Sequence, residues 1–502
     1  MPSRHVLTLL APSWGHTLPY IHLTTRMLAS DPELVITIVQ HNLVVHKMIE
    51  ELSSCSYDTS RLKIEGVGDN EIHYSPLIVE TMLKQLTAGW IKVLAKAATE
   101  ETAWPKPRTL HMDFFGGGFV AKESRAFLGP EGKILVWFSS AATACVDTCS
   151  EYDFPKVAQE IYADQSRRAG RTMQEIFGDV LCAGNGSDKL DGRVLEIVGG
   201  VRMYDHEHTA QGAGPPRPLA PVLISAQELA SLADGFFCPT GTPLEPVTAP
   251  LCREYYKKRG QELFLVGPQM HDVEWEAPLA GAGPSDERVK SFLDDAREKF
   301  GPKSVLYISF GSLFFPVETP QLVEAMVDVL LSLDAAIPFI FVLAGKMAAL
   351  PKETIDRIHA SGRGIVCAHW VDQKAVLKSG TIGWFLTHGG YNSLTEALSQ
   401  GIPLIFWPIG AEQAVNAATL STGPHPIGIE LFQMNTPMKS FKAPNITGTI
   451  EDAKAEFLQV FMDVKESRGE TLKRHATQIG DAWREERKNG EPVKEIARLT
   501  RF

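Results

Sequence analysis

Short apolar runs alternate with longer amphipathic segments along the chain, beginning at its first residues. Residues 5–11 form an apolar run typical of a buried strand, residues 18–28 repeat apolar side chains with a helical period, and residues 35–40 form a second strand pattern. A polar turn with Gly15 and His16 separates the first strand from the helix. Strand, helix and strand in this order predict the start of a parallel α/β sheet.

The rest of the first half continues this pattern and includes one long loop. Residues 74–98 are apolar-rich with a helical pattern, whereas residues 205–221 contain four prolines and little periodicity, which predicts a mobile loop. Short apolar runs predict further strands at 109–115, 133–138, 195–199, 222–226, 235–238 and 263–267, and the segment 119–128 is predicted to be helical.

A second series of strand and helix patterns follows, without any repeat of the first series in sequence. Its last two helices are long, charged and amphipathic, and their charges are expected to form solvated faces. The predicted strands lie at 304–310, 339–343, 364–369, 382–387, 402–406 and 425–431, and the predicted helices at 321–333, 394–400, 452–468 and 470–488.

A stretch between the two series lacks periodicity. Residues 269–287 are rich in Gly, Pro and acidic residues, which predicts an interdomain linker. We therefore expect an N-terminal domain at 1–268, a C-terminal domain at 288–465 and final helices at 466–502. With 502 residues in all, each half is long enough to bury a core of its own.

Composition narrows the class of protein. Hydrophobic residues make up 44% of the chain and charged residues 22%, as in ordinary globular proteins. The net charge of -11 argues against nucleic acid as a partner, because binding phosphate backbones needs basic surface. The seven cysteines form no C-x-x-C pair, so we expect a reducing compartment and no zinc or other metal site. No apolar stretch is long enough for a signal peptide or a membrane anchor, and we expect a cytoplasmic monomer.

The strongest chemical signal lies at residues 370–413. Two predicted strands there are separated by His388-Gly389-Gly390-Tyr391-Asn392-Ser393 and an amphipathic helix. Strand, Gly-rich turn, helix and strand form one half of a nucleotide-binding α/β fold. The glycines allow close approach of the backbone to a ligand, and the free N–H groups of a helix start attract phosphate. The turn is therefore predicted to bind a pyrophosphate.

The two ends of this stretch add further ligand chemistry. Glu412 and Gln413 follow the second strand, at the sheet edge where open α/β sheets bind ligands, and a carboxylate beside an amide can hydrogen-bond the hydroxyls of a polyol. Trp370 can stack on a flat base. Taken singly, Trp370 is more typical of a core, and Glu396, Glu412 and Gln413 of a surface; only their joint spacing favours a site.

With this spacing, residues 370–413 resemble the donor-binding motif of family 1 UDP-sugar glycosyltransferases, enzymes well known in plant secondary metabolism, over the full length of the motif and without a gap. The resemblance implies a GT-B fold, in which two Rossmann-like α/β domains face each other across a cleft. It implies that Trp370 and Val371 hold uracil, that Gln373 and Glu396 hold the ribose, and that Glu412 and Gln413 hold the sugar. The diphosphate contacts implied by the resemblance are His388, Asn392 and Ser393, with Ser312 of the Phe-Gly-Ser turn after 304–310, and the donor-binding set also includes Gly15 and Gly390.

The motif departs from the plant pattern at Tyr391, where Trp is usual, at Ser379, where His is usual, and at Glu412, where Asp is usual. Two of these positions border the sugar. Gln413 goes with glucose in the family, so UDP-glucose is the expected donor, with UDP-xylose and UDP-N-acetylglucosamine as alternatives.

The same resemblance assigns a candidate base. Family members begin with a strand, a Gly-His pair and a nearby Pro, and Gly15, His16 and Pro19 fit that order. The histidine would be the catalytic base, paired with an aspartate that ends a later strand, which is Asp113 here. Without the resemblance, His16 reads as a polar loop histidine and Asp113 equally well as a helix N-cap.

A competing motif lies directly after Asp113. Residues 116–121 match the dinucleotide pattern G-x-G-x-x-A, which leaves a nicotinamide-dependent oxidoreductase as an alternative. That pattern also needs an acidic residue at the end of the next strand to bind a ribose, and the next strand ends in Ser139-Ser140.

The predicted activity is therefore inverting transfer of a sugar, glucose first, from a UDP-sugar to a hydroxyl of a small, mostly apolar acceptor of phenolic, flavonoid or terpenoid kind, without a metal cofactor. A sterol or lipid acceptor is an alternative within this class. A non-catalytic UDP-sugar-binding protein is a further alternative, against which the presence of both His16 and Asp113 argues.

Overall fold

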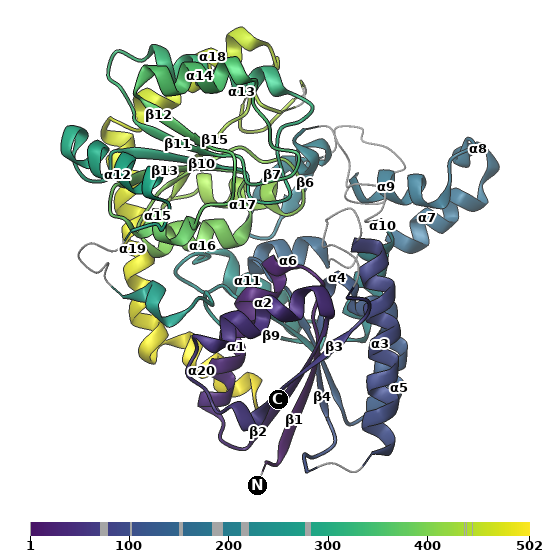
Figure 1. Ribbon diagram of the computed structural model, residues 1–502. Coiled ribbons are helices and arrows are strands. Elements are labelled where there is room, and N and C mark those ends of the chain that lie inside the picture. Colours follow the sequence, from purple (N-terminus) through teal and green to yellow (C-terminus); the bar gives the residue numbers. More distant parts are fainter. Residues whose placement is uncertain are drawn as a thin grey trace.

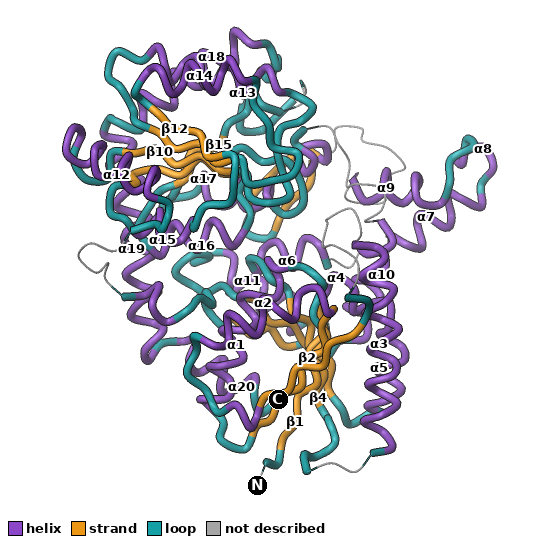
Figure 2. The backbone as a smooth tube through the Cα atoms, in the orientation of Figure 1, coloured by secondary structure: helices purple, strands orange, loops and turns teal. Residues whose placement is uncertain are grey.

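The computed structural model describes residues 2–70, 79–100, 103–149, 154–182, 194–211, 220–276, 283–435, 437, 439–443 and 445–502. Two α/β halves, each built on a parallel sheet, lie one above the other in Figure 1, with the N-terminal half below. Strands form the centre of each half and helices cover the faces (Figure 2). The predicted α/β class with two Rossmann-like sheets is confirmed.

The N-terminal half contains a seven-stranded sheet in the order β3-β2-β1-β4-β5-β8-β9. All its neighbouring strands are parallel, and β2 is buried over its whole length, as expected for a sheet covered on both faces. The strands are β1 (Arg4–Leu9), β2 (Leu34–His41), β3 (Leu62–Val67), β4 (Thr109–Asp113), β5 (Lys133–Trp137), β8 (Gly235–Cys238) and β9 (Glu262–Leu265).

The helices of this half connect the parallel strands. The α7–α9 region extends to one side of the molecule in Figure 1. The α-helices are α1 (Trp14–Ser30), α2 (Asn42–Ser53), α3 (Val79–Thr99), α4 (Phe114–Gly117), α5 (Ala121–Leu128), α6 (Ala142–Thr148), α7 (Phe154–Ala163), α8 (Gln165–Arg168), α9 (Met173–Cys182), α10 (Ala220–Leu232) and α11 (Thr248–Lys257), with short 3-10 helices η1 (Thr59–Arg61), η3 (Gly118–Val120), η4 (Asp205–Thr209) and η6 (Asp272–Trp275).

The C-terminal half contains a six-stranded parallel sheet in the order β12-β11-β10-β13-β14-β15. The strands are β10 (Val305–Ser309), β11 (Phe339–Val342), β12 (Gly364–Cys367), β13 (Ile382–Thr387), β14 (Leu404–Phe406) and β15 (Gly428–Glu430). The helices are α12 (Glu287–Phe300), α13 (Pro320–Ser332), α14 (Lys352–Ser361), α15 (Gln373–Lys378), α16 (Tyr391–Ser399), α17 (Gln413–Ser421), α18 (Ile450–Asp463), α19 (Ser467–Asn489) and α20 (Glu491–Leu499).

Two segments cross from one half to the other. Helix α19 packs on α16 and runs down the left side of the molecule in Figure 1, so that α20 packs on α1 and β9 of the N-terminal half. In the other direction, the antiparallel hairpin of β6 (Val194–Ile197) and β7 (Val201–Tyr204) leads into η4, where His206 Nε2 lies 2.6 Å from the carbonyl of Lys439 and Gln211 donates to the carbonyl of Met434. The halves are thereby joined on both sides of the cleft.

Most predicted elements lie within a few residues of the observed ones, and one strand is wrong. Residues 222–226, predicted as a strand, belong to helix α10. Val222, Ala226 and Leu229 are all buried at helical spacing, so the short apolar run was part of a longer helical stripe.

Other boundaries also shift. Helix α1 begins at Trp14, so His16 lies in its first turn rather than in a loop before it. The segment 205–221, predicted as a loop, contains η4 and the start of α10, and its residues 212–219 lie outside the described residues. The predicted helix at 452–468 ends at Asp463, and α20 was not predicted.

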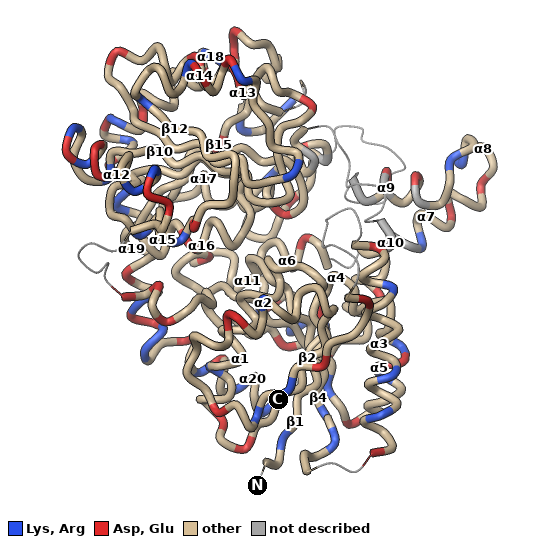
Figure 3. Tube along the Cα trace, in the orientation of Figure 1, with Lys and Arg blue, Asp and Glu red and all other residues tan. Residues whose placement is uncertain are grey.

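The segment predicted as a linker, 269–287, contains η6, and its residues 277–282 lie outside the described residues, as do residues 74–78 of the helix predicted at 74–98. Acidic and basic residues are interspersed on the outer helices and loops (Figure 3). Among the residues that the structure describes, no helix has the length and apolar character needed to span a membrane.

Candidate active site

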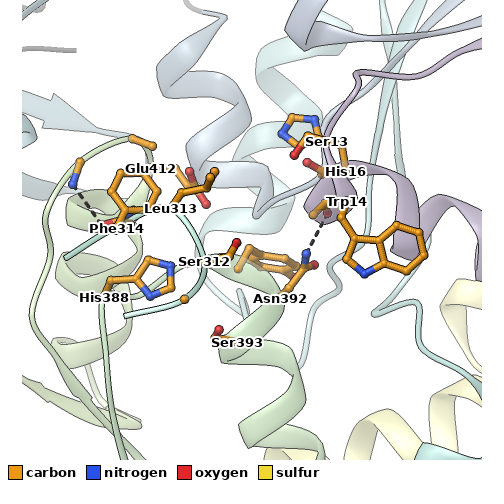
Figure 4. Close-up of a pocket in the computed structure, with 18 of the residues that line it drawn as sticks. Ser13, Trp14, His16, Ser312, Leu313, Phe314, His388, Asn392, Ser393 and Glu412 are labelled. Atoms are coloured by element: carbon orange, nitrogen blue, oxygen red, sulfur yellow. Dashed lines mark hydrogen bonds between the residues drawn. The ribbon is translucent and has the colours of Figure 1, made fainter. Parts of the chain in front are cut away.

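A cavity of about 2190 Å³ lies between the two halves and is lined by residues from both. It opens at the carboxyl ends of β1, β4, β10 and β13, where chain turns lead from strands into helices. This is the edge at which open α/β sheets bind ligands. Figure 4 shows Trp14 and His16 on one side of this space and Ser312, His388 and Ser393 on the other.

His16 and Asp113 meet although nearly a hundred residues separate them in sequence. His16 Nδ1 lies 2.9 Å from Asp113 Oδ1 and 3.1 Å from Oδ2. Asp113 is 1% exposed, whereas the His16 side chain is 20% exposed and lines the cavity. An ionised carboxylate only accepts hydrogen bonds, so Nδ1 carries the proton and the lone pair of Nε2 is left free. The imidazole is therefore held in the tautomer that a general base needs.

Charges around His16 tune its basicity. Burial lowers the pKa of His16, but the charge of Asp113 and its hydrogen bond, with a further contribution from Glu412, outweigh burial and raise the pKa above its usual value. Phe114 stacks on the imidazole with ring centroids 5.4 Å apart. His16 is thus a strengthened base beside an apolar surface.

On the opposite wall, glycines make room for His388. Gly389 has φ +90°, and a Cβ atom on Gly390 would lie 2.4 Å from His388 Nε2, while one on Gly311 would lie 2.9 Å from Cε1. The absence of a side chain at Gly390 therefore makes room for the imidazole, and Gly390 itself lines the cavity. Burial lowers the pKa of His388 to about 4, so the ring is neutral near pH 7.

Helix α16 begins at this turn, with Gly390 as its N-cap. The backbone N–H groups of the first turn have no intrahelical acceptor, and they carry the positive end of the helix dipole. Asn392 and Ser393 lie in this turn and line the cavity. The Asn392 side chain donates to the carbonyl of Gly15 at 2.8 Å, across the cleft (Figure 4). The N-terminal end of α16 is thereby fixed against the turn that carries His16.

A hydrogen-bonded group of side chains forms the wall next to α15. Gln373 Nε2 donates to Glu396 at 2.7 Å and to Ser393 at 3.2 Å, and the Tyr307 hydroxyl donates to Gln373 Oε1 at 3.4 Å. Burial raises the pKa of Glu396. Trp370 at the edge of this wall is 66% exposed and lines the cavity, so its ring face is free to stack on a planar group.

Glu412, near the end of residues 370–413, faces His16. Burial raises the pKa of Glu412, and the positive charge of His16 opposes that shift. Gln413 is buried, and its Oε1 accepts from the backbone N–H groups of Ile409 and Gly410 at 2.9 and 3.0 Å. Its carbonyl oxygen is thus occupied in shaping the loop before α17.

The comparisons with known proteins agree with this geometry. A family model described as "UDP-glucoronosyl and UDP-glucosyl transferase" matches residues 274–437. The UDP-glycosyltransferase eriJ of Hericium erinaceus is 27% identical over 95% of both chains, and the nuatigenin 3-beta-glucosyltransferase of Solanum aculeatissimum is 36% identical over 34% of each chain. The predicted resemblance to family 1 UDP-glycosyltransferases is thereby confirmed, and so is the predicted class of enzyme.

Solved structures show the fold of this UDP-glycosyltransferase independently. The UGT2 structure of Phytolacca americana matches 99% of both chains with a TM-score of 0.66 at 19% identity. Its fold is the GT-B arrangement, so the predicted fold is confirmed.

The structure brings nearly all of the sequence-derived site residues of this UDP-glycosyltransferase to one cavity. Asp113 does not line it but holds His16 from behind. The residues that line the cavity are Gly15, His16, Ser312, Trp370, Val371, Gln373, His388, Gly390, Asn392, Ser393, Glu396, Glu412 and Gln413.

Several lining residues were missed by the sequence reasoning. Trp14 lies beside His16, Phe314 stacks on His388 with ring centroids 5.6 Å apart, and Tyr307 hydrogen-bonds Gln373. One signal for Phe314 was present, because three apolar residues directly follow the Gly311-Ser312 turn. No local pattern marks Tyr307, which looks like any residue of a buried strand.

The segment 116–121, the alternative dinucleotide motif, has a structural role. A Cβ atom on Gly118 would lie 1.7 Å from the carbonyl oxygen of Ser225, so this glycine allows η3 to pack closely on α10. The N-terminus of this turn is capped by Asp113, which accepts from the N–H of Phe115 at 2.9 Å. The glycines thus serve packing between helices.

Proposed function

We propose that this UDP-glycosyltransferase moves glucose from UDP-glucose to a hydroxyl of a small, mostly apolar acceptor, with inversion at the anomeric carbon. The observation that carries the proposal is the His16–Asp113 pair, which presents a free Nε2 to the cavity opposite the N-terminus of α16.

His16 is the general base of this scheme. Its Nε2 takes the proton of the acceptor hydroxyl as the oxygen attacks the anomeric carbon, and the bond from that carbon to the diphosphate breaks. Asp113 stabilises the imidazolium that forms, as in other histidine–aspartate pairs. Because one displacement occurs at one carbon, an α-linked donor gives a β-glycoside and UDP. General-base catalysis of this kind contributes about 10²–10⁴-fold.

The opposite wall is suited to the donor. The first-turn N–H groups of α16, the Ser312 hydroxyl and the neutral His388 imidazole can all donate hydrogen bonds to a diphosphate. Trp370 would stack on uracil, and the Gln373–Glu396 pair would bind the ribose hydroxyls. Glu412 and Gln413 would contact the sugar.

In this proposal the donor diphosphate is stabilised by protein donors alone, and no metal cofactor takes part. Among the described residues, no three His, Cys, Asp or Glu side chains are grouped so that they could hold a metal ion. Transfer should therefore continue at an unchanged rate after treatment with a chelator, and a loss of activity that added Mg²⁺ restores would contradict the proposal.

An apolar acceptor suits the N-terminal side of the cavity, where aromatic and aliphatic side chains predominate, among them Leu83, Phe114, Phe115, Phe119 and Phe138. The named relatives point the same way, since one is called a nuatigenin 3-beta-glucosyltransferase and the Phytolacca americana UGT2 structure contains pterostilbene. The volume of the cavity also accommodates a sterol-like acceptor, which remains the second candidate.

The deciding experiment is product formation from UDP-glucose with a panel of phenols, terpenoid alcohols and sterols, measured by mass spectrometry. A hexose mass gain is expected with the wild type. The His16→Ala variant should lose about 10²–10⁴-fold in kcat and still bind UDP, because His16 acts on the acceptor proton only. Full activity in this variant would overturn the mechanism, and UDP binding without any transfer or donor hydrolysis in the wild type would favour a non-catalytic binder.

A further inference from the structure

The acceptor side of the cavity contains a second imidazole and carboxylate, separate from His16 and Asp113. Asp147 lies in the last turn of α6, and His208 lies in η4. The Nε2 atom of His208 is 3.6 Å from Oδ1 of Asp147, and both side chains line the cavity. The side chains are 25% and 20% exposed, so each is largely withdrawn from bulk water.

This Asp147–His208 pair is incompletely satisfied. A distance of 3.6 Å is too long for a direct hydrogen bond, and in the described part of the chain neither side chain forms another one. Withdrawing a carboxylate from water without a hydrogen bond is unfavourable, and so is a negative charge in the last turn of a helix. Burial accordingly raises the pKa of Asp147, although His208 opposes the shift. Stability alone does not account for an acid at this position.

An aromatic surface connects the reaction centre with α6, the helix that carries Asp147. Phe114 stacks on His16, and the rings of Phe114 and Phe138 lie with centroids 4.4 Å apart. Phe138 directly follows β5, and after three more residues the chain enters α6, which carries Asp147. A flat or fused apolar body lying on these rings would have one end at His16 and would extend toward α6.

We propose that Asp147 and His208 form a second polar subsite, which binds a hydroxyl of the acceptor other than the one that is glycosylated. The hydroxyl oxygen lies beside the two groups, where it donates to the Asp147 carboxylate and accepts from the His208 N–H. The enzyme therefore selects apolar acceptors with hydroxyls at two ends over acceptors with one. This assignment rests on the proposed transfer to an apolar acceptor and specifies which acceptors are preferred.

The test compares acceptors that differ by one hydroxyl. The probes are 4,4′-dihydroxystilbene against 4-hydroxystilbene, and 2,6-dihydroxynaphthalene against 2-naphthol, so that two spacings are sampled. With the wild type, kcat/KM for the diol of at least one pair should exceed that of the mono-ol by roughly 10–100-fold, beyond the statistical factor of two, as expected for a hydrogen bond to a charged group. The preference should appear mainly in KM.

The variants Asp147→Ala and His208→Ala should lose this preference and leave kcat for the mono-ols unchanged. Asp147→Asn keeps an oxygen that accepts a hydrogen bond and should retain part of the preference. Asp179→Ala is the matched control, because it removes a carboxylate paired with Arg171 outside the cavity and should change nothing. Equal kcat/KM for diol and mono-ol in both wild-type pairs would overturn the subsite, as would an equal loss for both acceptors in the variants, which marks a structural ion pair.

Binding separates this inference from the proposed reaction. Affinities of the same probes are measured by calorimetry in the presence of UDP. If no transfer occurs but the wild type binds a diol more tightly than its mono-ol, and Asp147→Ala abolishes the difference, the subsite stands and the reaction is wrong. If diols and mono-ols bind equally, or none binds, the subsite is wrong.

Discussion

At the scale of single residues, Asp113 both caps a turn and holds an imidazole. One of its oxygens accepts from the N–H of Phe115 and caps the turn after β4, and the carboxylate also holds His16 Nδ1. The cap and the contact with His16 are therefore present together. The cap fixes the carboxylate, and a fixed carboxylate fixes the imidazole.

This geometry predicts the pH dependence of the transfer. In the proposed mechanism His16 is active when neutral, and its pKa is raised by Asp113 and Glu412 against the effect of burial. The acid limb of kcat/KM should therefore lie above about pH 6.5, the usual histidine value, with activity falling as the pH drops through it. In Asp113→Asn the carboxylate no longer offsets the lowering of the His16 pKa by burial, so the acid limb should move to lower pH. At the same time kcat should fall by roughly 10²-fold or more.

Asparagine can still cap the turn through its side-chain oxygen, so Asp113→Asn should fold like the wild type. Circular dichroism provides that control. An acid limb that stays in place in this variant would show that another group titrates.

At the scale of elements, the turns after β10 and β13 form the cavity wall opposite His16. Their glycines leave room for side chains of the neighbouring turn. Gly311 follows β10 with φ +74°, directly against the His388 ring that follows β13. Two turns from two strands thus fit together at one imidazole, which is held neutral by burial.

Gly311→Ala should therefore weaken UDP binding. The added methyl group meets His388 at 2.9 Å, in a backbone conformation that disfavours a Cβ atom. We expect a loss of about 1–3 kcal/mol in the free energy of unfolding and about tenfold in UDP affinity, measured by thermal denaturation and calorimetry.

Gly362→Ala is the matched control for that substitution. Gly362 ends α14 with φ +64°, and a Cβ atom there meets nothing within 4 Å. It should show only the backbone cost of about 1 kcal/mol and unchanged UDP affinity. If both variants bind UDP equally well, His388 is not a donor contact.

At the scale of the whole molecule, the cleft depends on contacts that join the two halves. Asn392 reaches the carbonyl of Gly15, and the Tyr391 hydroxyl donates to the carbonyl of Pro239 at 3.0 Å. Tyr391, the departure from the plant motif that the sequence placed beside the sugar, is thus also a buried link to the N-terminal half. On the far side, α20 adds Ile496 and Leu499 to the N-terminal core.

Leu499→Ala should destabilise the enzyme although it changes a residue near the end of the chain. Leu499 is 1% exposed and belongs to the same core cluster as Tyr20 and Val266. Removal of its buried methyl groups should lower the free energy of unfolding by about 2–5 kcal/mol, measured by denaturant titration. Lys494→Ala, an exposed change on the same helix, should stay within about 0.5 kcal/mol, and equal stability of the two variants would contradict the docking of α20.

The amino-acid sequence by itself determined the α/β class and the wall of the cavity formed by residues 370–413. Most helices and strands follow from apolar periodicity, and residues 370–413 form a continuous stretch whose side chains gather because strand, turn and helix are neighbours in the chain. Even so, a run as short as 222–226 fits a strand or a helix equally well. Its structure was decided only by its place within the longer helix α10.

Tertiary structure alone decided which distant side chains meet. Asp147 with His208, Tyr307 with Gln373, and Asn392 with Gly15 join segments that no spacing rule relates. His16 with Asp113 was expected only through family resemblance, and its 2.9 Å contact depends on β1 and β4 lying side by side in the sheet. Periodicity encodes elements because it is local, whereas a site forms where the packing of whole elements brings their ends together.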